Sequence, residues 1–195
     1  MVKLSAKAIK PSVSRLRDDL EKLFSKNRMV VFLCGPTLKA RVKGPGARLR
    51  KKLEKALSDD GFEVVLGEDD GLEELRKRYT GYAHENELKF IRNECGAIVL
   101  IADSVGSYCE LGLFSHAHTH TDNNTTDFIL IIDKKYKRKK SYLNEGPAKA
   151  IKDFGTVFYE DLDKFDYSEV IERLRGRRTV YVLGGRGRPP TRRYI

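Results

Sequence analysis

The stretch LIADSVGSYCELGLFSH, residues 100–116, places a carboxylate, Glu110, where it could take part in chemistry. An apolar run typical of a buried strand leads into a glycine-containing turn, and a helix is expected to begin near Gly106. Gly106 lets the backbone come close to a ligand, while Ser104 and Ser107 add hydroxyl groups beside the free N–H groups of a helix N-terminus. The pattern predicts a cradle for a small anion, with Glu110 at its rim.

Glu110 has two interpretations. The helix dipole keeps a carboxylate in the first turns of a helix ionised, which suits a nucleophile, but the same position is also favoured for helix stability alone. The segment HENELKF precedes the same strand and would supply Glu85 or Glu87 as a second carboxylate. Two carboxylates near one crevice are the minimum for glycosyl chemistry, in which one attacks or stabilises an oxocarbenium-like carbon and the other handles protons. A solvated acidic helix face is the alternative for Glu85 and Glu87.

The scaffold for these residues is predicted from alternating strand-like and helix-like segments. Helical patterns separate apolar strand-like runs at 29–34, 62–66, 97–102, 128–133 and 156–160. Strands that are apolar on both faces and alternate with helices predict a doubly wound α/β domain. We therefore expect a mainly parallel, five-stranded, Rossmann-like or flavodoxin-like sheet with helices on both faces. Ligands bind such sheets beyond the carboxyl ends of the strands.

The two ends of the chain do not follow this alternation of strands and helices. We expect an amphipathic helix within residues 1–27, the α/β domain at 28–176 and a basic C-terminal segment at 177–195. The last segment contains an expected edge strand at 179–183, followed by a Gly/Pro/Arg tail. The tail is interpreted as solvated and disordered, with nucleic-acid contact as the alternative.

Composition limits the classes of function. The 195 residues suffice for one domain, and 38 Lys and Arg against 28 Asp and Glu give a net charge of +10, which attracts polyanions or phosphorylated ligands. The run KKYKRKK at 134–140 is either a solvated loop or a surface for phosphates and nucleic acid. No apolar run approaches the roughly 20 residues that span a bilayer, so we expect a cytoplasmic protein without membrane contact.

The cysteines and histidines give no metal site. The cysteine count is odd without CxxC spacing, which predicts buried thiols in a reducing compartment: Cys34, Cys95 and Cys109. The segment HAHTHTD offers His116, His118, His120 and Asp122. In a continuous helix only the first and third of these histidines share a face, so we predict the polar end of a helix there instead of a metal centre.

Four segments, VVFLCGP, NEL, AIVLIADSVGSYCELG and NEGPAKAI, resemble the nucleoside 2-deoxyribosyltransferase-like superfamily, in particular its members that serve as effectors of retrons and other anti-phage systems. The resemblance runs from about residue 29 to 160. It implies that Glu110, which precedes LG, is the nucleophile that attacks the anomeric carbon of a sugar. It also implies that Glu87, in NEL, helps to orient the substrate or to protonate the base.

The same resemblance implies further site residues. Gly35 and Pro36 match the turn beneath the base and the sugar. Ser104 matches the phosphate-binding serine of relatives that hydrolyse nucleoside 5′-monophosphates, where transferases acting on free nucleosides have an aspartate. Its neighbour Asp103 is counted among the candidate catalytic residues, as a polar side chain without an assigned step. Within NEGP, the candidate substrate contacts are Asn144 and Gly146.

The expected function is hydrolysis of an N-glycosidic bond. A 5′-phosphorylated nucleoside or NAD would place its phosphate on the turn from Ser104 to Ser107, and Glu110 would form a covalent glycosyl-enzyme that water resolves. We expect no cofactor, and we expect a homo-oligomer because relatives often build their sites across subunits. The alternative is a non-catalytic nucleotide-binding or nucleic-acid-associated regulator on the same sheet, in which Glu110 only stabilises its helix.

Overall fold

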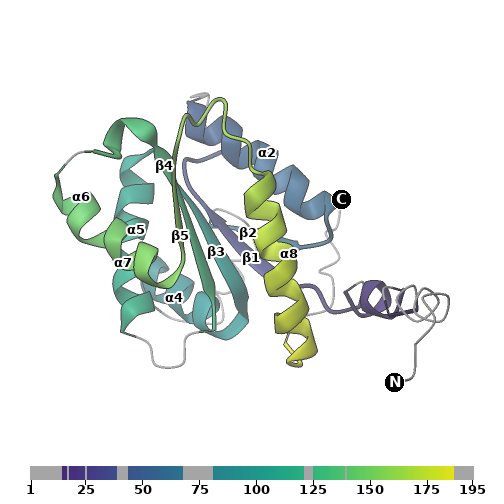
Figure 1. Cartoon of the computed structure of the whole chain (residues 1–195). Helices are drawn as coiled ribbons and strands as arrows, with labels where there is room; N and C mark the ends of the chain where they lie inside the picture. The colour runs from purple at the N-terminus through teal and green to yellow at the C-terminus, as the bar shows by residue number, and fades with distance from the viewer. Residues whose placement is uncertain are drawn as a thin grey trace, which may run out of the picture.

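One parallel sheet of five strands forms the centre of the protein. The computed structural model describes residues 15–16, 18–24, 26–38, 44–67, 81–120, 125–138 and 140–186. The strands are β1 (Val30–Cys34), β2 (Glu63–Leu66), β3 (Cys95–Ala102), β4 (Asp127–Asp133) and β5 (Thr156–Glu160). Their order in the sheet is β2-β1-β3-β4-β5, and each neighbouring pair is parallel (Figure 1). This is the flavodoxin-like strand order, which confirms the predicted doubly wound fold.

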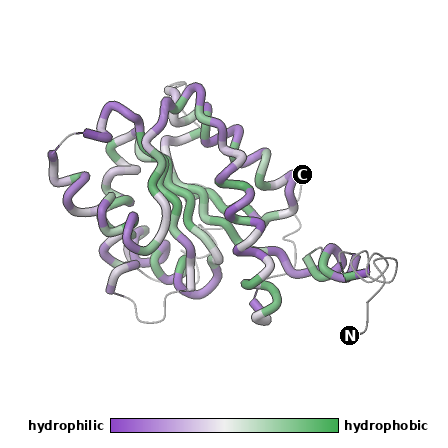
Figure 2. Tube along the Cα trace, in the orientation of Figure 1, coloured by the Kyte–Doolittle hydropathy of each residue, from purple (hydrophilic) through white to green (hydrophobic). Residues whose placement is uncertain are grey.

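Helices cover both faces of the sheet. On one face lie α2 (Pro45–Asp59) and α8 (Ser168–Leu183), and on the other lie α4 (Ala83–Glu94), α5 (Val105–Thr119) and α7 (Pro147–Phe154) (Figure 1). Two short helices, η1 (Lys134–Tyr136) and α6 (Tyr142–Glu145), follow β4. Each face buries its own apolar cluster. Figure 2 shows the hydrophobic residues gathered along the strands, because strands covered on both faces must be apolar on both.

The strand order places a topological switch between β1 and β3. The chain leaves β1 through α2 on one face of the sheet, whereas α4 and α5, on either side of β3 in the sequence, cover the other face. The turns that follow β1 and β3 therefore diverge at the carboxyl edge, and open α/β sheets bind ligands in the crevice that this divergence leaves. The segments CGP and DSVG lie at this position.

The C-terminal prediction is wrong for residues 179–183. They belong to α8, in which Tyr181 and Val182 are buried. The Tyr181 hydroxyl donates a hydrogen bond of 2.8 Å to the Glu94 carbonyl, and Arg178 lies over the Phe62 ring. These contacts with the core outweigh the strand preference of the β-branched residues. The tail at 187–195, and residues 1–14, 17 and 25 of the expected N-terminal helix, lie outside the described residues.

Burial confirms part of the cysteine prediction. Cys34 and Cys95 are buried, whereas Cys109 is exposed, because α5 turns Leu111 and Phe114 toward the sheet and Cys109 away from it. Within the described part of the chain, no helix is long and apolar enough to cross a membrane. The described residues also contain no group of three side chains suited to a metal ion, and Asp122 is not among them.

Candidate active site

The turn after β1 is held by a buried arginine. Gly35 has φ +148°, and a Cβ atom there would lie 3.1 Å from the Ile101 carbonyl oxygen, so the turn requires glycine. Arg50 of α2 is 1% exposed, and its Nε and Nη2 donate to the Leu33 carbonyl at 3.2 and 2.7 Å. Its Nη1 donates to the Pro36 carbonyl at 3.0 Å. One guanidinium therefore fixes both sides of the turn that contains Gly35 and Pro36.

Asp103, at the end of β3, binds the N-terminus of α2. Its Oδ2 accepts a hydrogen bond of 2.9 Å from the Gly46 N–H. The N-cap of α2 is Gly44, which has no side chain to cap the helix, so Asp103 supplies both the acceptor and a negative charge at the positive end of the helix dipole. A Cβ atom on Gly46 would lie 2.6 Å from the Asp103 Cβ, so the approach requires glycine. Asp103 and Arg50 together fasten α2 to the ends of β3 and β1.

Ser104 and Ser107 form the capping box of α5. The Ser107 N–H donates to Ser104 Oγ at 3.2 Å, and the Ser104 N–H donates to Ser107 Oγ at 2.9 Å. The two hydroxyl groups are also 3.0 Å apart, so they satisfy each other and the helix end. The N–H groups of Val105 and Gly106 are in the first turn, where an α-helix provides no acceptor of its own. These backbone N–H groups are therefore the donors that a helix N-terminus offers to an anion.

Glu110 and Glu87 lie around the carboxyl end of β1. Burial raises the pKa of the Cys34 thiol well above its ordinary value, the negative charge of Glu110 raises it further, Arg50 lowers it and Glu87 raises it. Both carboxylates thus act on the same buried thiol, Glu110 from α5 and Glu87 from α4. The Glu87 Oε1 also lies 3.7 Å from where a Cβ on Gly67, at the end of β2, would stand. Both carboxylates therefore lie within electrostatic range of the end of β1, and their joint role in one site stays a prediction.

Glu85 has a different position. It is the third residue of α4, and its Oε2 accepts a hydrogen bond of 3.4 Å from the Tyr82 N–H, which completes a capping box. Its carboxylate therefore contributes to the start of the helix. Of the two alternatives in HENELKF, Glu87 is the one whose charge, like that of Glu110, acts on Cys34.

The NEGP segment connects η1 with β5. Asn144 Nδ2 donates to the Tyr136 carbonyl at 2.6 Å, and the Tyr159 hydroxyl donates to Asn144 Oδ1 at 2.8 Å. Gly146 joins α6 to α7. Tyr136 packs edge-on against Tyr108 of α5, at 6.2 Å between ring centroids, and burial together with a hydrogen bond to Tyr136 raises the pKa of Tyr108. Asn144 thus supports the wall beside α5, and its contact with a substrate stays a prediction.

Two hollows of opposite charge flank β5. A groove of about 860 Å³ over α6, α7 and β5, here called the basic groove, is lined by five cations. These are Lys137, Arg138, Lys140, Lys149 and Lys152. None of them is ion-paired with another described residue. The groove therefore attracts anions, although Glu145, Asp153 and Glu160 also line it.

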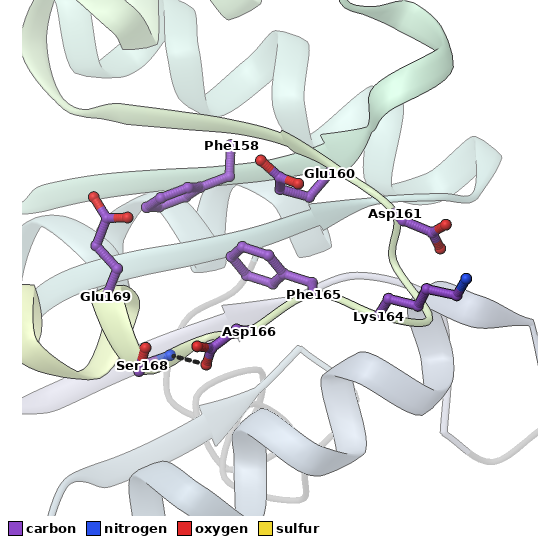
Figure 3. Close-up of a pocket in the computed structure, with 8 residues that line it drawn as sticks. All are labelled: Phe158, Glu160, Asp161, Lys164, Phe165, Asp166, Ser168 and Glu169. Atoms are coloured by element: carbon purple, nitrogen blue, oxygen red, sulfur yellow. Dashed lines mark hydrogen bonds between the residues drawn. The ribbon is translucent and has the colours of Figure 1, made fainter.

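The second hollow, of about 420 Å³, lies where β5 leads into α8 (Figure 3). Phe158 and Phe165 form its apolar wall, with ring centroids 5.4 Å apart. The rest of the lining includes one cation, Lys164, and four carboxylates: Glu160, Asp161, Asp166 and Glu169. This charge opposes a phosphate, so the hollow is unsuited to a nucleotide. The candidate active site is placed at the ends of β1 and β3 because the charges of Glu110 and Glu87 act there.

Sequence reasoning missed Arg50 and Asn86. An arginine is usually expected on the solvated face of a helix. The spacing of Arg50 from Leu53 and Leu57 instead places it on the buried stripe of α2, and this spacing was the signal in the sequence. Asn86 is likewise four residues before the buried Phe90. A polar residue at a core position of a helix beside the carboxyl edge of a sheet is therefore worth singling out.

Comparison with known proteins relates the chain to retron proteins. A family model described as "STM3845 retron effector protein" matches residues 47–181, from α2 to α8. An Escherichia coli protein named "Retron Ec86 putative ribosyltransferase/DNA-binding protein" is 37% identical over 59 residues. This alignment covers 30% of the chain and 18% of the relative, so the chain spans only a small share of the length of that protein in the match.

Proposed function

Because this chain belongs to the STM3845 retron effector family, we propose that it is an anti-phage effector that cleaves the base–sugar bond of a nucleotide, with Glu110 as nucleophile. The observation that carries the proposal is the pair of carboxylates, Glu110 and Glu87, around the end of β1 at the topological switch. The name of the Escherichia coli relative includes ribosyltransferase, which supports glycosyl transfer as the class of reaction. Within the proposal, the chain is a member of the nucleoside 2-deoxyribosyltransferase-like superfamily.

The proposed substrate is a 5′-phosphorylated nucleoside or NAD. Its phosphate would bind the N–H groups of Val105 and Gly106 at the N-terminus of α5, where the helix dipole favours an anion. The turn at Gly35 and Pro36, held by Arg50, would lie beneath the sugar and the base. This arrangement would place the C1′ atom of the sugar between the two carboxylates.

The reaction proceeds in two steps. A Glu110 carboxylate oxygen attacks C1′, the bond from C1′ to the base nitrogen breaks, and the base leaves with a proton supplied by Glu87 or by a water molecule. Water then attacks C1′ of the glycosyl ester as the bond from C1′ to the Glu110 oxygen breaks. Its hydroxyl group stays on the sugar, its proton goes to Glu87 or to the hydroxide left by the first step, and Glu110 returns to its ionised form. The net reaction is hydrolysis of the N-glycosidic bond. Arg50 also lies close enough to lower the pKa of the Cys34 thiol, so it places a positive charge near the end of β1.

The test is release of free base from a panel of nucleosides, nucleoside 5′-monophosphates, triphosphates and NAD, followed by chromatography. Glu110→Gln should lower the rate by a factor on the order of 10³ or more, because it removes the nucleophile. Glu85→Gln is the matched control, since this carboxylate only caps α4, and it should retain nearly full activity. Equal release by wild type and Glu110→Gln would remove Glu110 from the mechanism, and no release from any phosphorylated substrate would favour the non-catalytic regulator.

The basic groove supports a second proposed function, contact with nucleic acid. Its five cations have no ion-pair partner in the described parts of the chain, and the name of the Escherichia coli relative includes DNA-binding protein. Binding of an oligonucleotide should weaken as salt rises, because the cations displace counterions from the phosphates. Binding that does not change with salt would contradict this proposal.

The expected homo-oligomer is likewise a proposal, which size-exclusion chromatography with light scattering would test.

A further inference from the structure

Asn86 is a buried amide to which the described part of the chain offers no hydrogen-bond partner. The residue is 2% exposed, and neither Nδ2 nor Oδ1 has a partner among the described residues. A carboxamide offers two donors and two acceptor sites, and leaving a buried polar group unsatisfied costs about 1–3 kcal/mol. Such a group in a folded protein calls for an explanation, and a bound ligand is one of them.

The amide lies on the side of α4 that faces the sheet, with Oδ1 3.6 Å from where a Cβ on Gly81 would stand. Asn86 shares a helix face with Phe90, four residues later, and the Phe90 ring packs edge-on against Phe32 of β1 at 5.8 Å. In a parallel sheet the connecting helix runs opposite to the strands, so the N-terminus of α4 lies at the carboxyl edge. Asn86 is therefore one turn nearer that edge than Phe90. Its neighbour in the sequence is Glu87, whose charge acts on Cys34 at the end of β1.

We propose that the Asn86 carboxamide reads the edge of the base that leaves, with Nδ2 donating to an acceptor on the base and Oδ1 accepting from a donor. This inference rests on the proposed function and specifies its substrate class. Bases with an adjacent donor and acceptor fit, such as the amino-substituted edges of adenine and cytosine or the carboxamide of nicotinamide. Bidentate pairing accounts for the two buried atoms together, since both are satisfied by one ligand. Glu87, the next residue, then lies beside the base that it protonates.

The test uses Glu110→Gln protein, so that binding is measured without turnover. Calorimetry compares two matched pairs of free bases: adenine with purine, and nicotinamide with pyridine, the second member of each lacking the exocyclic group. In at least one pair, the base with the complete edge should bind about 10-fold or more tightly, because a good bidentate pair discriminates by about 1–3 kcal/mol. Adding Asn86→Leu should abolish this preference. Adding Asn93→Leu, at an exposed position on the same helix, should leave it intact.

Stability provides a second measurement. Asn86→Leu should keep or raise the Tm, because an apolar side chain of similar shape removes two unsatisfied buried groups. A fall of several degrees would show that the amide is satisfied within the folded protein, for example by buried water, and would overturn the proposal. Asn86→Asp, which retains the volume but lacks the donors, should also lose the preference.

The remaining outcomes are equally decisive. A preference that survives Asn86→Leu, or no preference with Asn86 intact, would overturn the assignment of Asn86. A preference that depends on Asn86 in a protein that releases no base would uphold the assignment while rejecting the proposed hydrolysis. The two proposals therefore fail separately.

Discussion

The two sides of the crevice differ in how their polar groups are satisfied. On the side of α2 and α5, Arg50, Asp103, Ser104 and Ser107 all bind backbone groups at the ends of β1 and β3 or at helix N-termini. On the side of α4, Asn86 is buried without a partner in the described structure. These four side chains serve as scaffold, whereas the Asn86 carboxamide leaves hydrogen-bonding capacity for a ligand. Substitutions of the four should therefore lower stability, and substitution of Asn86 should alter binding.

The largest effect is expected at Arg50. Arg50→Ala leaves the Leu33 and Pro36 carbonyls without this donor and opens a cavity. The free energy of unfolding should therefore fall by roughly 3 kcal/mol. That corresponds to a fall in Tm on the order of 10 °C, measurable by calorimetry. Arg48→Ala is the control from the same helix, because its ion pair with Asp163 is half exposed and contributes less than about 1 kcal/mol. Similar losses in the two variants would contradict the role given to Arg50.

Asp103 should show the next largest effect. Asp103→Ala removes the acceptor for the Gly46 N–H and the charge at the N-terminus of α2, which should cost about 1–2 kcal/mol in denaturant unfolding. Asp103→Asn keeps an acceptor oxygen and should lose less. Turnover by Asp103→Asn tests the catalytic interpretation separately: normal base release would assign Asp103 to positioning, whereas lost release in a stable protein would place it in the reaction.

Ser104→Ala should cost about 1 kcal/mol, the usual value for a lost N-cap, or roughly 2–4 °C in Tm. Affinity for a nucleoside 5′-monophosphate should fall little, because the backbone N–H groups of Val105 and Gly106 remain. Ser168→Ala, at an exposed position at the start of α8, is the control for stability. A large loss of phosphate binding with unchanged Tm would instead show that the Ser104 hydroxyl holds the phosphate.

The smallest change in stability is expected in the basic groove. The double variant Lys149→Ala and Lys152→Ala should alter the free energy of unfolding by less than about 0.5 kcal/mol, because neither side chain has an ion-pair partner among the described residues. It should weaken binding of a single-stranded oligonucleotide and reduce the slope of log affinity against log salt by up to about 1.4. Lys55→Ala, which removes a pair with Asp59, is the control. Unchanged oligonucleotide binding in the double variant would place the contact elsewhere.

The fold could be predicted from the sequence because its signals are local and repeated. The five apolar runs required a buried sheet, and the helices between them required parallel strands, although the order of the strands came only from the structure. The expected strand at 179–183 failed because contacts across the molecule, such as Tyr181 with Glu94, decide that segment. Local propensity cannot register such contacts.

The candidate site was predictable only in part. The spacing of Glu110 and Glu87 relative to the strands predicted that both lie near the end of the sheet, and both act electrostatically on Cys34 of β1, but their shared site stays a prediction. The roles of Ser104 and Ser107 could not be read from their types, because a hydroxyl at a helix N-terminus caps the helix and binds anions by the same geometry. Arg50 and Asn86 were overlooked because burial of a polar side chain depends on which face of its helix meets the sheet.

The distribution of the three thiols makes α5 accessible to chemical labelling. Cys34 and Cys95 are buried, and the pKa of Cys34 is raised, so neither should form a reactive thiolate at neutral pH. Cys109 is exposed and precedes Glu110 in the same helix. A maleimide fluorophore would therefore attach at one position of the unmodified chain, next to the proposed nucleophile. Its emission would report occupancy of the crevice in real time, without a radioactive substrate or an engineered cysteine.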